Sequence, residues 1–285
     1  MLKEILHFIL HLRLHYQFLI LSGGYLLGGF LAGEMNVDTY LWQFLNVHIL
    51  LFGGATAYNS WWDKDKGPIG GLKHPPKMEP WMHPASLALM FAGQAAAMKV
   101  GIIYSIIYFT SMLFFWLYST PLARWKSTPH LSLFAIAVST GLNSVMLGLL
   151  AAGGSFSLQV LLAAAGASII LVSLYPVSQI FQIEEDRQRG DTTFALQYGV
   201  AGVKRFFLSF YTAGSLLLCI ALMLDSLLAG TLLLAGTTIS GIIIAQFIFG
   251  LSGRKEEYRI VMKTKFYASL SFVTFFLAAI IIRYS

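Results

Sequence analysis

An amide and a carboxylate four residues apart close the second of two long apolar runs. Asn59 and Asp63 stand in the stretch NSWWDKDKGPIGGLKHPP, residues 59–76. At this spacing two side chains share one face of a helix end. Their oxygens are hard ligands of the kind that magnesium takes together with substrate phosphate. Asp65 adds a third oxygen group, so we predict a magnesium site at Asn59, Asp63 and Asp65.

Cations surround these oxygen ligands. The same stretch and its continuation hold Lys64, Lys66, Lys73, His74 and Lys77. Such groups bind phosphate oxygens through charge-assisted hydrogen bonds. We predict that Lys73 and His74 contact a phosphorylated substrate. The alternative is a solvated loop whose lysines only orient a membrane protein, and the residues leave both interpretations open.

A second polar stretch repeats the pairing of an amide with an acid. In SQIFQIEEDRQRGDTTFALQYG, residues 178–199, Gln182 and Asp186 are again four residues apart. We predict that both are metal ligands and that Arg187 behind them binds substrate. Asp191 and Thr192 have a structural alternative, because such residues cap helices. Helix capping does not explain four acids beside two arginines at the end of an apolar run.

The segments that must position these loops are membrane-spanning. Of 285 residues, 57% are hydrophobic and 11% are charged, with a mean hydropathy of +0.70. A soluble domain carries about 25% charged residues, and the apolar runs are long enough to cross a bilayer as helices. We predict an all-α polytopic membrane bundle of about nine transmembrane helices. The predicted spans are residues 15–33, 38–58, 84–99, 101–119, 129–151, 156–178, 202–224, 229–251 and 261–283.

The charges predict the orientation of this bundle. All of the 19 Lys and Arg residues except Lys99 and Arg283 fall on the side of the N-terminus. The positive-inside rule then predicts a cytoplasmic N-terminus, cytoplasmic polar loops and an external C-terminus in the cell inner membrane. We treat residues 1–285 as one domain. Four spans separate the two polar loops, which suggests an internal repeat with halves 13–128 and 129–285.

The two loops resemble the aspartate-rich motifs of the UbiA-type membrane prenyltransferases. The first motif of that family runs Asn-x-x-x-Asp-x-x-x-Asp, and Asn59 and Asp63 match its first two positions. SQIFQIEED aligns with a second motif that ends at Asp186. A third stretch, LYSTPLARWK at 117–126, is similar to the family's Tyr-x-x-Pro-Leu-basic segment. The resemblance covers nearly the whole chain, with the three motifs in the right order and on the right side.

This resemblance implies a function. It implies transfer of an isoprenyl group, an alkyl group other than methyl, from its diphosphate to an aromatic or other lipid-precursor acceptor such as a quinone precursor. Magnesium on Asp63 and Asp186, with Asn59 as a further active-site residue, would neutralise the diphosphate. Lys73, Arg124, Lys126 and Arg187 would share that task. An allylic cation would form beside aromatic rings, with Tyr118 and Tyr175 among the candidates.

The chain also departs from the family pattern. Gly67 stands at the third position of the first motif, and Gln179 and Gln182 replace acids of the second. One metal ion of the pair usual in the family would then bind weakly or be absent. Two other classes therefore stay open, namely a catalytically impaired relative that binds prenyl lipids, and a transporter. The expected partners are the prenyl diphosphate, its acceptor and the lipid bilayer, without nucleic acid or a protein partner.

One further polar residue lies inside a predicted span. Asn143 in GLNSVMLG is an intramembrane amide. Hydrogen bonding between helices is the ordinary role of such a residue, and contact with the substrate or acceptor is the functional alternative. We include Asn143 among the predicted substrate-binding residues.

Overall fold

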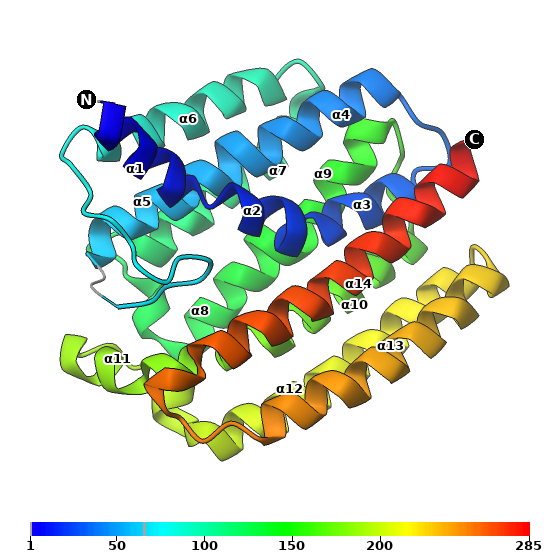
Figure 1. Ribbon diagram of the computed structural model, residues 1–285. Helices are drawn as coiled ribbons and strands as arrows, with labels where there is room; N and C mark the ends of the chain where they lie inside the picture. The colour runs from blue at the N-terminus through cyan, green and yellow to red at the C-terminus, as the bar shows by residue number, and fades with distance from the viewer. Residues whose placement is uncertain (1, 65–66) are drawn as a thin grey trace.

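The computed structural model describes residues 2–64 and 67–285, and within them the chain is a bundle of helices (Figure 1). Apart from an isolated bridge between Ile69 and Leu72, the described residues form helices and their connections. The elements are α1 (Leu2–Leu12), α2 (Leu14–Tyr16), η1 (Gln17–Leu21), α3 (Ser22–Leu31), α4 (Val37–Leu45), η2 (Asn46–Gly53), α5 (Gly54–Asp63), α6 (Met82–Ala97), α7 (Ile102–Ser119), η3 (Trp125–Ser127), α8 (Pro129–Ile136), η4 (Ala137–Leu142), α9 (Asn143–Ala152), α10 (Leu158–Leu174), η5 (Pro176–Gln182), α11 (Ile183–Arg189), α12 (Phe194–Met223), α13 (Leu227–Phe249), η6 (Lys255–Glu257) and α14 (Tyr258–Tyr284).

The described elements join into nine long rods, which confirms the predicted all-α bundle. Three of the rods are composites of α-helices and a π-helical segment: residues 14–31, residues 37–63 and residues 129–152. Seven helical stretches are long and apolar enough to cross a membrane by length and composition. The rod 37–63 and the 16-residue α6 are not among these seven. The second rod is longer than the predicted span 38–58, so Asn59 and Asp63 lie in the last turns of α5.

Each composite rod contains a π-helical segment: η1, η2 or η4. A π-helix replaces the i→i+4 hydrogen bonds with i→i+5 bonds, which widens the rod locally and often marks a functional site. The apolar periodicity continues through all three segments, and for this reason the sequence does not reveal them. Each of the three segments places at least one side chain, Gln17, Phe52 or Thr140, on the wall of the cavity described below.

The rods pack through small residues and aromatic rings. An added Cβ at Gly28 would lie 2.0 Å from the carbonyl oxygen of Val145, and one at Gly148 would lie 2.0 Å from that of Tyr25. The backbones of α3 and α9 therefore approach each other at these glycines, as small residues permit between membrane helices. Tyr25 and Tyr40 pack beside this contact with ring centroids 4.9 Å apart.

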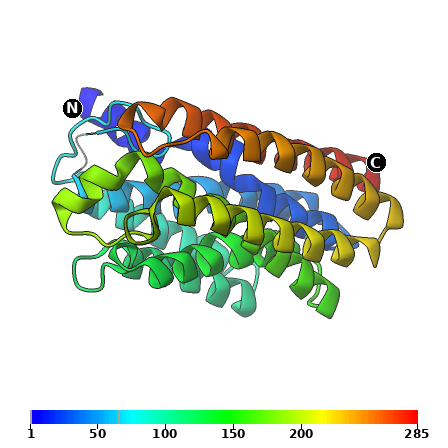
Figure 2. The same cartoon turned by 90° about the horizontal axis from the view of Figure 1, so that it is seen from below.

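The longer connections gather at one end of the bundle. Figures 1 and 2 show the N-terminus, the segment after α5 and helix α11 at the same end, whereas the C-terminus lies at the other. The two polar stretches, distant in sequence, thus meet at one mouth. This agrees with the parallel placement that the charge pattern predicts.

Candidate active site

A cavity of about 260 Å³ opens between the rods at the end that carries the long connections. Asn59 and Asp63 line it from the end of α5, and Gln182 and Asp186 line it from η5 and α11. The structure therefore brings both predicted amide–acid pairs to one cavity. Apolar side chains also line the cavity, with Phe52, Phe115 and Leu171 among them.

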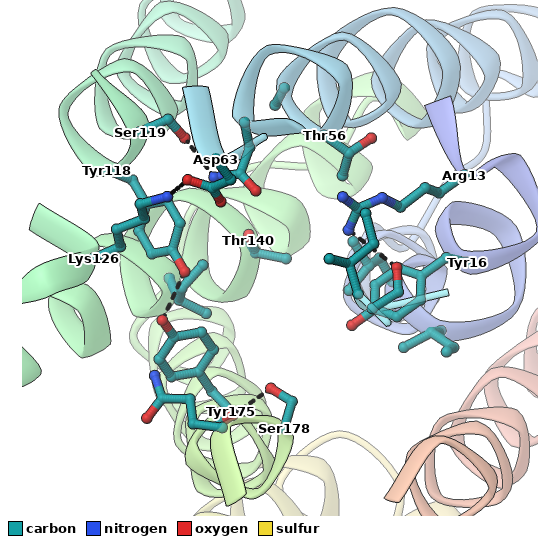
Figure 3. Close-up of a pocket in the computed structure, with 18 of the residues that line it drawn as sticks. Arg13, Tyr16, Thr56, Asp63, Tyr118, Ser119, Lys126, Thr140, Tyr175 and Ser178 are labelled. Atoms are coloured by element: carbon teal, nitrogen blue, oxygen red, sulfur yellow. Dashed lines mark hydrogen bonds and ion pairs between the residues drawn. The ribbon is translucent and has the colours of Figure 1, made fainter. Parts of the chain in front are cut away.

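Asp63 is neutralised by a lysine of the segment between α7 and α8. The ammonium of Lys126 forms an ion pair with the carboxylate of Asp63, and each side chain is only 10% exposed. Burial lowers the pKa of Lys126 to about 8, against the raising effect of Asp191 and Asp186. Figure 3 shows this pair on one wall of the cavity, beside Tyr118.

Asp186 and Asp191 belong to a network of ion pairs at the same wall, where both line the cavity. Arg189 lies 2.6 Å from Asp186 and 3.4 Å from Asp191. The guanidinium of Arg124 donates two hydrogen bonds to Asp191, at 2.8 and 3.0 Å. Thr193 donates a further bond of 2.9 Å to the second oxygen of Asp186. Bidentate arginine pairs of this kind fix a segment firmly, so the network links the third motif to the second.

Two hydroxyl-bearing rings lie next to the Asp63–Lys126 pair. The hydroxyl groups of Tyr118 and Tyr175 are 2.7 Å apart, and both residues line the cavity (Figure 3). The side-chain amide of Asn59 donates to the hydroxyl of Ser119, 3.1 Å away. That bond directs the amide nitrogen of Asn59 toward Ser119 of α7, so the amide oxygen is the atom that could meet a ligand.

The opposite wall carries positive charge from other elements. Arg13 and Tyr16 line it from the break between α1 and η1, and Figure 3 shows them across the cavity from Asp63 and Lys126. The guanidinium of Arg13 donates to Ser60 Oγ and to the carbonyl oxygen of Gly70. Lys265 of α14 donates to the hydroxyl of Tyr16 at 3.0 Å.

Backbone strain concentrates around this mouth. Among the described residues, Arg13, Lys64 and Arg124 are the non-glycine residues with positive φ, at 51°, 50° and 44°. A left-handed conformation costs such residues roughly 1–2 kcal/mol, and it persists where neighbouring contacts enforce it. Arg13 lines the cavity, Lys64 follows Asp63, and Arg124 holds Asp191. Each strained backbone thus adjoins a charged group of the site.

Part of the first polar stretch covers the cavity. Ile69 and Gly70 line it, and Ile69 and Leu72 exchange two backbone hydrogen bonds of 2.9 Å across a tight turn. Gly71 within this turn has φ of +86°, which a residue with a Cβ rarely adopts. Side chains from four other elements hold residues 68–76 through carbonyl oxygens; they are His11, Arg13, His15, Gln182 and Tyr258.

An apolar space extends from the cavity into the bundle. A second cavity of about 170 Å³ shares with the first a set of wall residues that includes Ile20, Leu21, Thr140, Leu171 and Leu174. Its far wall is formed by α13 and α14, with Leu233 and Phe275 among the lining side chains. All three π-helical segments contribute to the walls of the first cavity, through Gln17, Phe52 and Thr140 among others.

Several predicted site residues lie elsewhere. Lys73 and His74 are exposed and are not among the residues that line the cavity. Arg187 points to solvent, with its side chain 62% exposed and paired to Glu184. Arg124 serves Asp191 behind the wall. Asp65 lies outside the described residues.

Asn143 is the remaining predicted residue that the structure does not bring to the cavity. Its side-chain amide donates to Ser111 Oγ at 2.9 Å, and the residue is 5% exposed. The bond joins α9 to α7, a contact of the kind that intramembrane amides ordinarily make between helices. Of the predicted residues, Asn59, Asp63, Tyr118, Lys126, Gln182 and Asp186 do line the cavity.

Some residues of the site were absent from the prediction. Arg189, Asp191 and Lys265 line the cavity, although the sequence analysis assigns none of them a role in the site. The sequence carries only a weak signal for Lys265, because this lysine falls within the predicted span 261–283, where ionisable side chains are unusual, but close to its charged start. Tyr16 had no comparable signal, since aromatic residues are common at membrane interfaces.

The donor set fits a single divalent ion held jointly with a phosphate. Among the described residues, no three His, Cys, Asp or Glu side chains converge as a metal cage. Magnesium does not need one, because it is held by one or two carboxylates, substrate phosphates and water. Asp63 and the amide oxygen of Asn59 supply ligands of that kind at the cavity wall, and Asp186 is a second carboxylate of the same cavity.

A family model and several solved structures resemble this chain. Residues 21–270 match the UbiA prenyltransferase family. A UbiA homologue from Archaeoglobus fulgidus, solved with GPP and Mg²⁺, superposes with a TM-score of 0.75 at 15% identity, over 96% of this chain and 99% of that one. An apo UbiA homologue from Aeropyrum pernix K1 gives 0.65 at 19% identity, over 94% and 98%.

A third similar structure is reported as a digeranylgeranylglyceryl phosphate synthase. It superposes with a TM-score of 0.65 at 16% identity, over 98% of this chain and 99% of that one. At these identities the structural likeness concerns the fold. A search of curated proteins found no match to this chain.

Proposed function

Because the chain belongs to the UbiA prenyltransferase family, we propose that it moves an isoprenyl group from a prenyl diphosphate to an acceptor at the mouth of the bundle. The observation that carries this proposal is the shared cavity. It gathers Asp63 and Asp186 from two stretches more than a hundred residues apart, and it continues into an apolar space. Such a site suits an amphiphile with an anionic head and a hydrocarbon tail.

The anionic head is placed at the wall that carries Asp63, Lys126 and Arg189. Lys126 and Arg189 are the cations closest to the two carboxylates, and they balance charge that grows on the diphosphate as it leaves. Fixed charges in a site shielded from water stabilise such developing charge strongly. We place magnesium on Asp63 with Asn59 and Asp186, where it would neutralise the leaving group as a Lewis acid.

The reaction exchanges one bond for another. The bond between C1 of the prenyl chain and the bridging oxygen breaks, and the electron pair leaves with the diphosphate. Positive charge on the allylic carbons is then favoured by nearby ring faces, and Tyr118 and Tyr175 are the rings beside the Asp63–Lys126 pair. A nucleophilic atom of the acceptor forms the new bond to C1 and releases a proton.

The tail is placed in the second cavity. Its walls are largely apolar and come from the membrane-spanning parts of α10, α13 and α14. Since the tail would already lie in lipid before it binds, the cavity selects its shape and length rather than supplying a hydrophobic driving force. With the charge asymmetry of the loops, this arrangement favours a cytoplasmic head site, a cytoplasmic N-terminus and an external C-terminus.

The test is prenyl transfer in membranes that contain the protein. Radiolabelled geranylgeranyl and farnesyl diphosphate are offered with a mixture of quinone-precursor and glycerol phosphate acceptors, with magnesium or with EDTA. We expect lipid-soluble product that disappears in EDTA and in Asp63→Asn and Asp186→Asn. Asp38→Asn is the matched control, because Asp38 is exposed at the other end of the bundle.

Binding measurements separate the alternatives. Magnesium-dependent binding of the diphosphate without transfer to any acceptor would favour the catalytically impaired relative, for which the glutamines at 179 and 182 are the motivation. Absence of both transfer and binding would refute the proposal, because the cavity would then serve something other than a diphosphate.

A further inference from the structure

A buried lysine lies in the wall opposite the acidic groups. Lys265 belongs to α14, seven residues after its first residue and so about 10 Å along the helix. Its side chain lines the first cavity, and the residue is 9% exposed. Lys263, two residues earlier, is exposed on another face of the same helix. Orientation by surface charge therefore explains Lys263 but does not explain Lys265.

No described carboxylate neutralises Lys265. Its ammonium donates to the hydroxyl of Tyr16 at 3.0 Å and lies 5.5 Å from the centroid of that ring. In contrast, Asp63, Asp186 and Asp191 each pair with a different nearby cation. A buried charge without a counterion is costly, because the ion has lost its hydration. Ionisable side chains kept inside a membrane helix therefore point to a function.

The groups around Lys265 are hydrogen-bond donors. The hydroxyl of Tyr16 accepts a bond from Lys265, and no described group accepts its own proton. Ser269 lies four residues after Lys265, on the same face of α14, and also lines the cavity. No hydrogen bond of its hydroxyl to a described residue is found. One ammonium and two hydroxyls thus face the cavity without an acidic acceptor, and this combination is complementary to an anion.

We propose that Lys265, Tyr16 and Ser269 bind an anionic group, a carboxylate or a phosphate, of the prenyl acceptor. The inference rests on the proposed prenyl transfer, and it narrows the acceptor to an acid. The diphosphate is assigned to the other wall, where the two carboxylates and Lys126 lie. Figure 3 shows Tyr16 across the cavity from Asp63 and Lys126. An acceptor anchored at Tyr16 thus has the space between the walls for its nucleophilic atom.

The test measures binding and does not require turnover. The purified full chain is saturated with magnesium and geranyl S-thiolodiphosphate, an analogue that does not ionise readily. The acid probes are 4-hydroxybenzoate, 1,4-dihydroxy-2-naphthoate and glycerol 1-phosphate, and the methyl esters and glycerol are their neutral counterparts. We expect at least one acid to bind, and Lys265→Met to weaken it about 10- to 100-fold, the worth of one charge-assisted hydrogen bond.

Three controls accompany this measurement. Lys263→Met is expected to bind the acid like the unmodified protein, because that lysine is exposed. Lys265→Arg keeps the charge and is expected to recover most of the affinity. Affinity for the thiolodiphosphate is expected to stay unchanged in Lys265→Met, which also shows that the variant is folded.

Each other outcome overturns the proposal. If Lys265→Met loses the thiolodiphosphate and keeps the acid, the lysine serves the diphosphate. If it keeps both, Lys265 has no part in binding the acceptor. If the unmodified protein binds the thiolodiphosphate but no acid, or binds the neutral counterparts as well as the acids, the acceptor is not selected by its charge. Failure to bind the thiolodiphosphate itself would refute the prenyl-transfer function and is thereby distinguished from these results.

Discussion

Gly236 offers a direct way to shorten the space assigned to the prenyl tail. It lies on α13 in a stripe with Leu233, Thr237 and Ser240, all of which line the second cavity. A Cβ added at Gly236 would meet no atom within 4 Å, whereas one at Gly141 of the same cavity would lie 2.3 Å from Ser168 Oγ. A side chain at position 236 therefore fills space without displacing the wall, and Gly236→Phe should block the cavity part-way.

The expected change in the specificity constant depends on which free-energy term of tail binding the new side chain alters. From Ser240 to Leu233 the helix rises about 10 Å, roughly the length of two extended isoprenyl units of four bonds each. A blocked tail is displaced into lipid, not into water, so the hydrophobic transfer term does not apply. What remains is the cost of forcing a chain into a filled space, about 1–3 kcal/mol. That cost corresponds to about 5- to 150-fold in the specificity constant.

The assay compares kcat/KM for geranylgeranyl and geranyl diphosphate, whose tails differ by two units. Gly236→Phe should lower the ratio of the two constants by about 5- to 150-fold and leave the geranyl value nearly unchanged. Ile239→Phe is the matched control, because Ile239 is on the same helix and 61% exposed. An unchanged ratio in a folded Gly236→Phe variant would mean that the tail takes another path, and the placement in the second cavity would be rejected.

Three further predictions concern the walls and the packing. Lys126→Met should lower the unfolding free energy in detergent by about 3–5 kcal/mol, because it leaves Asp63, 10% exposed, without its cation. Thermal unfolding measures this loss of stability, and full recovery of the stability in Lys126→Met/Asp63→Asn would confirm that the loss comes from the pair. Tyr118→Phe should slow prenyl transfer more than it weakens diphosphate binding, since it removes the partner of the Tyr175 hydroxyl; equal losses in kcat and in affinity would contradict a role near the reacting carbons. Gly28→Leu should prevent recovery of monodisperse protein, because its Cβ would meet a carbonyl oxygen at 2.0 Å; a folded variant in gel filtration would show that α3 and α9 can separate.

The sequence was sufficient for the bundle and for the acidic wall. Apolar runs and the one-sided distribution of charge are long-range signals, and they gave the nine rods. The placement of Asn59 and Asp63 was predictable because two residues four apart share one face of any helix end, and α5 forms that helix end. Asp186 was predictable by the same spacing, even though a break at Gln182, with φ of −107°, separates it from its partner.

The remaining parts of the site depend on tertiary contacts that spacing does not encode. Lys73 and His74 share the composition of a phosphate-binding loop, but the carbonyl oxygens of their segment make the contacts and the side chains stay in solvent. Lys126 and Arg124 are two residues apart, yet Lys126 lines the cavity, whereas Arg124, which has a left-handed backbone, holds Asp191. The π-helical segments likewise give no signal in the hydropathy pattern.

The anchoring of residues 68–76 has a consequence for the evolution of this loop. Five side chains from elsewhere in the chain hold the segment, and each bonds to a main-chain carbonyl, which any amino acid provides. The loop can therefore exchange most of its own side chains over generations and still keep its path over the site. The side chains that hold the loop cannot be exchanged as freely; they are His11, Arg13, His15, Gln182 and Tyr258. In a mutational scan, the protein should therefore tolerate substitutions within the loop better than substitutions at these five positions.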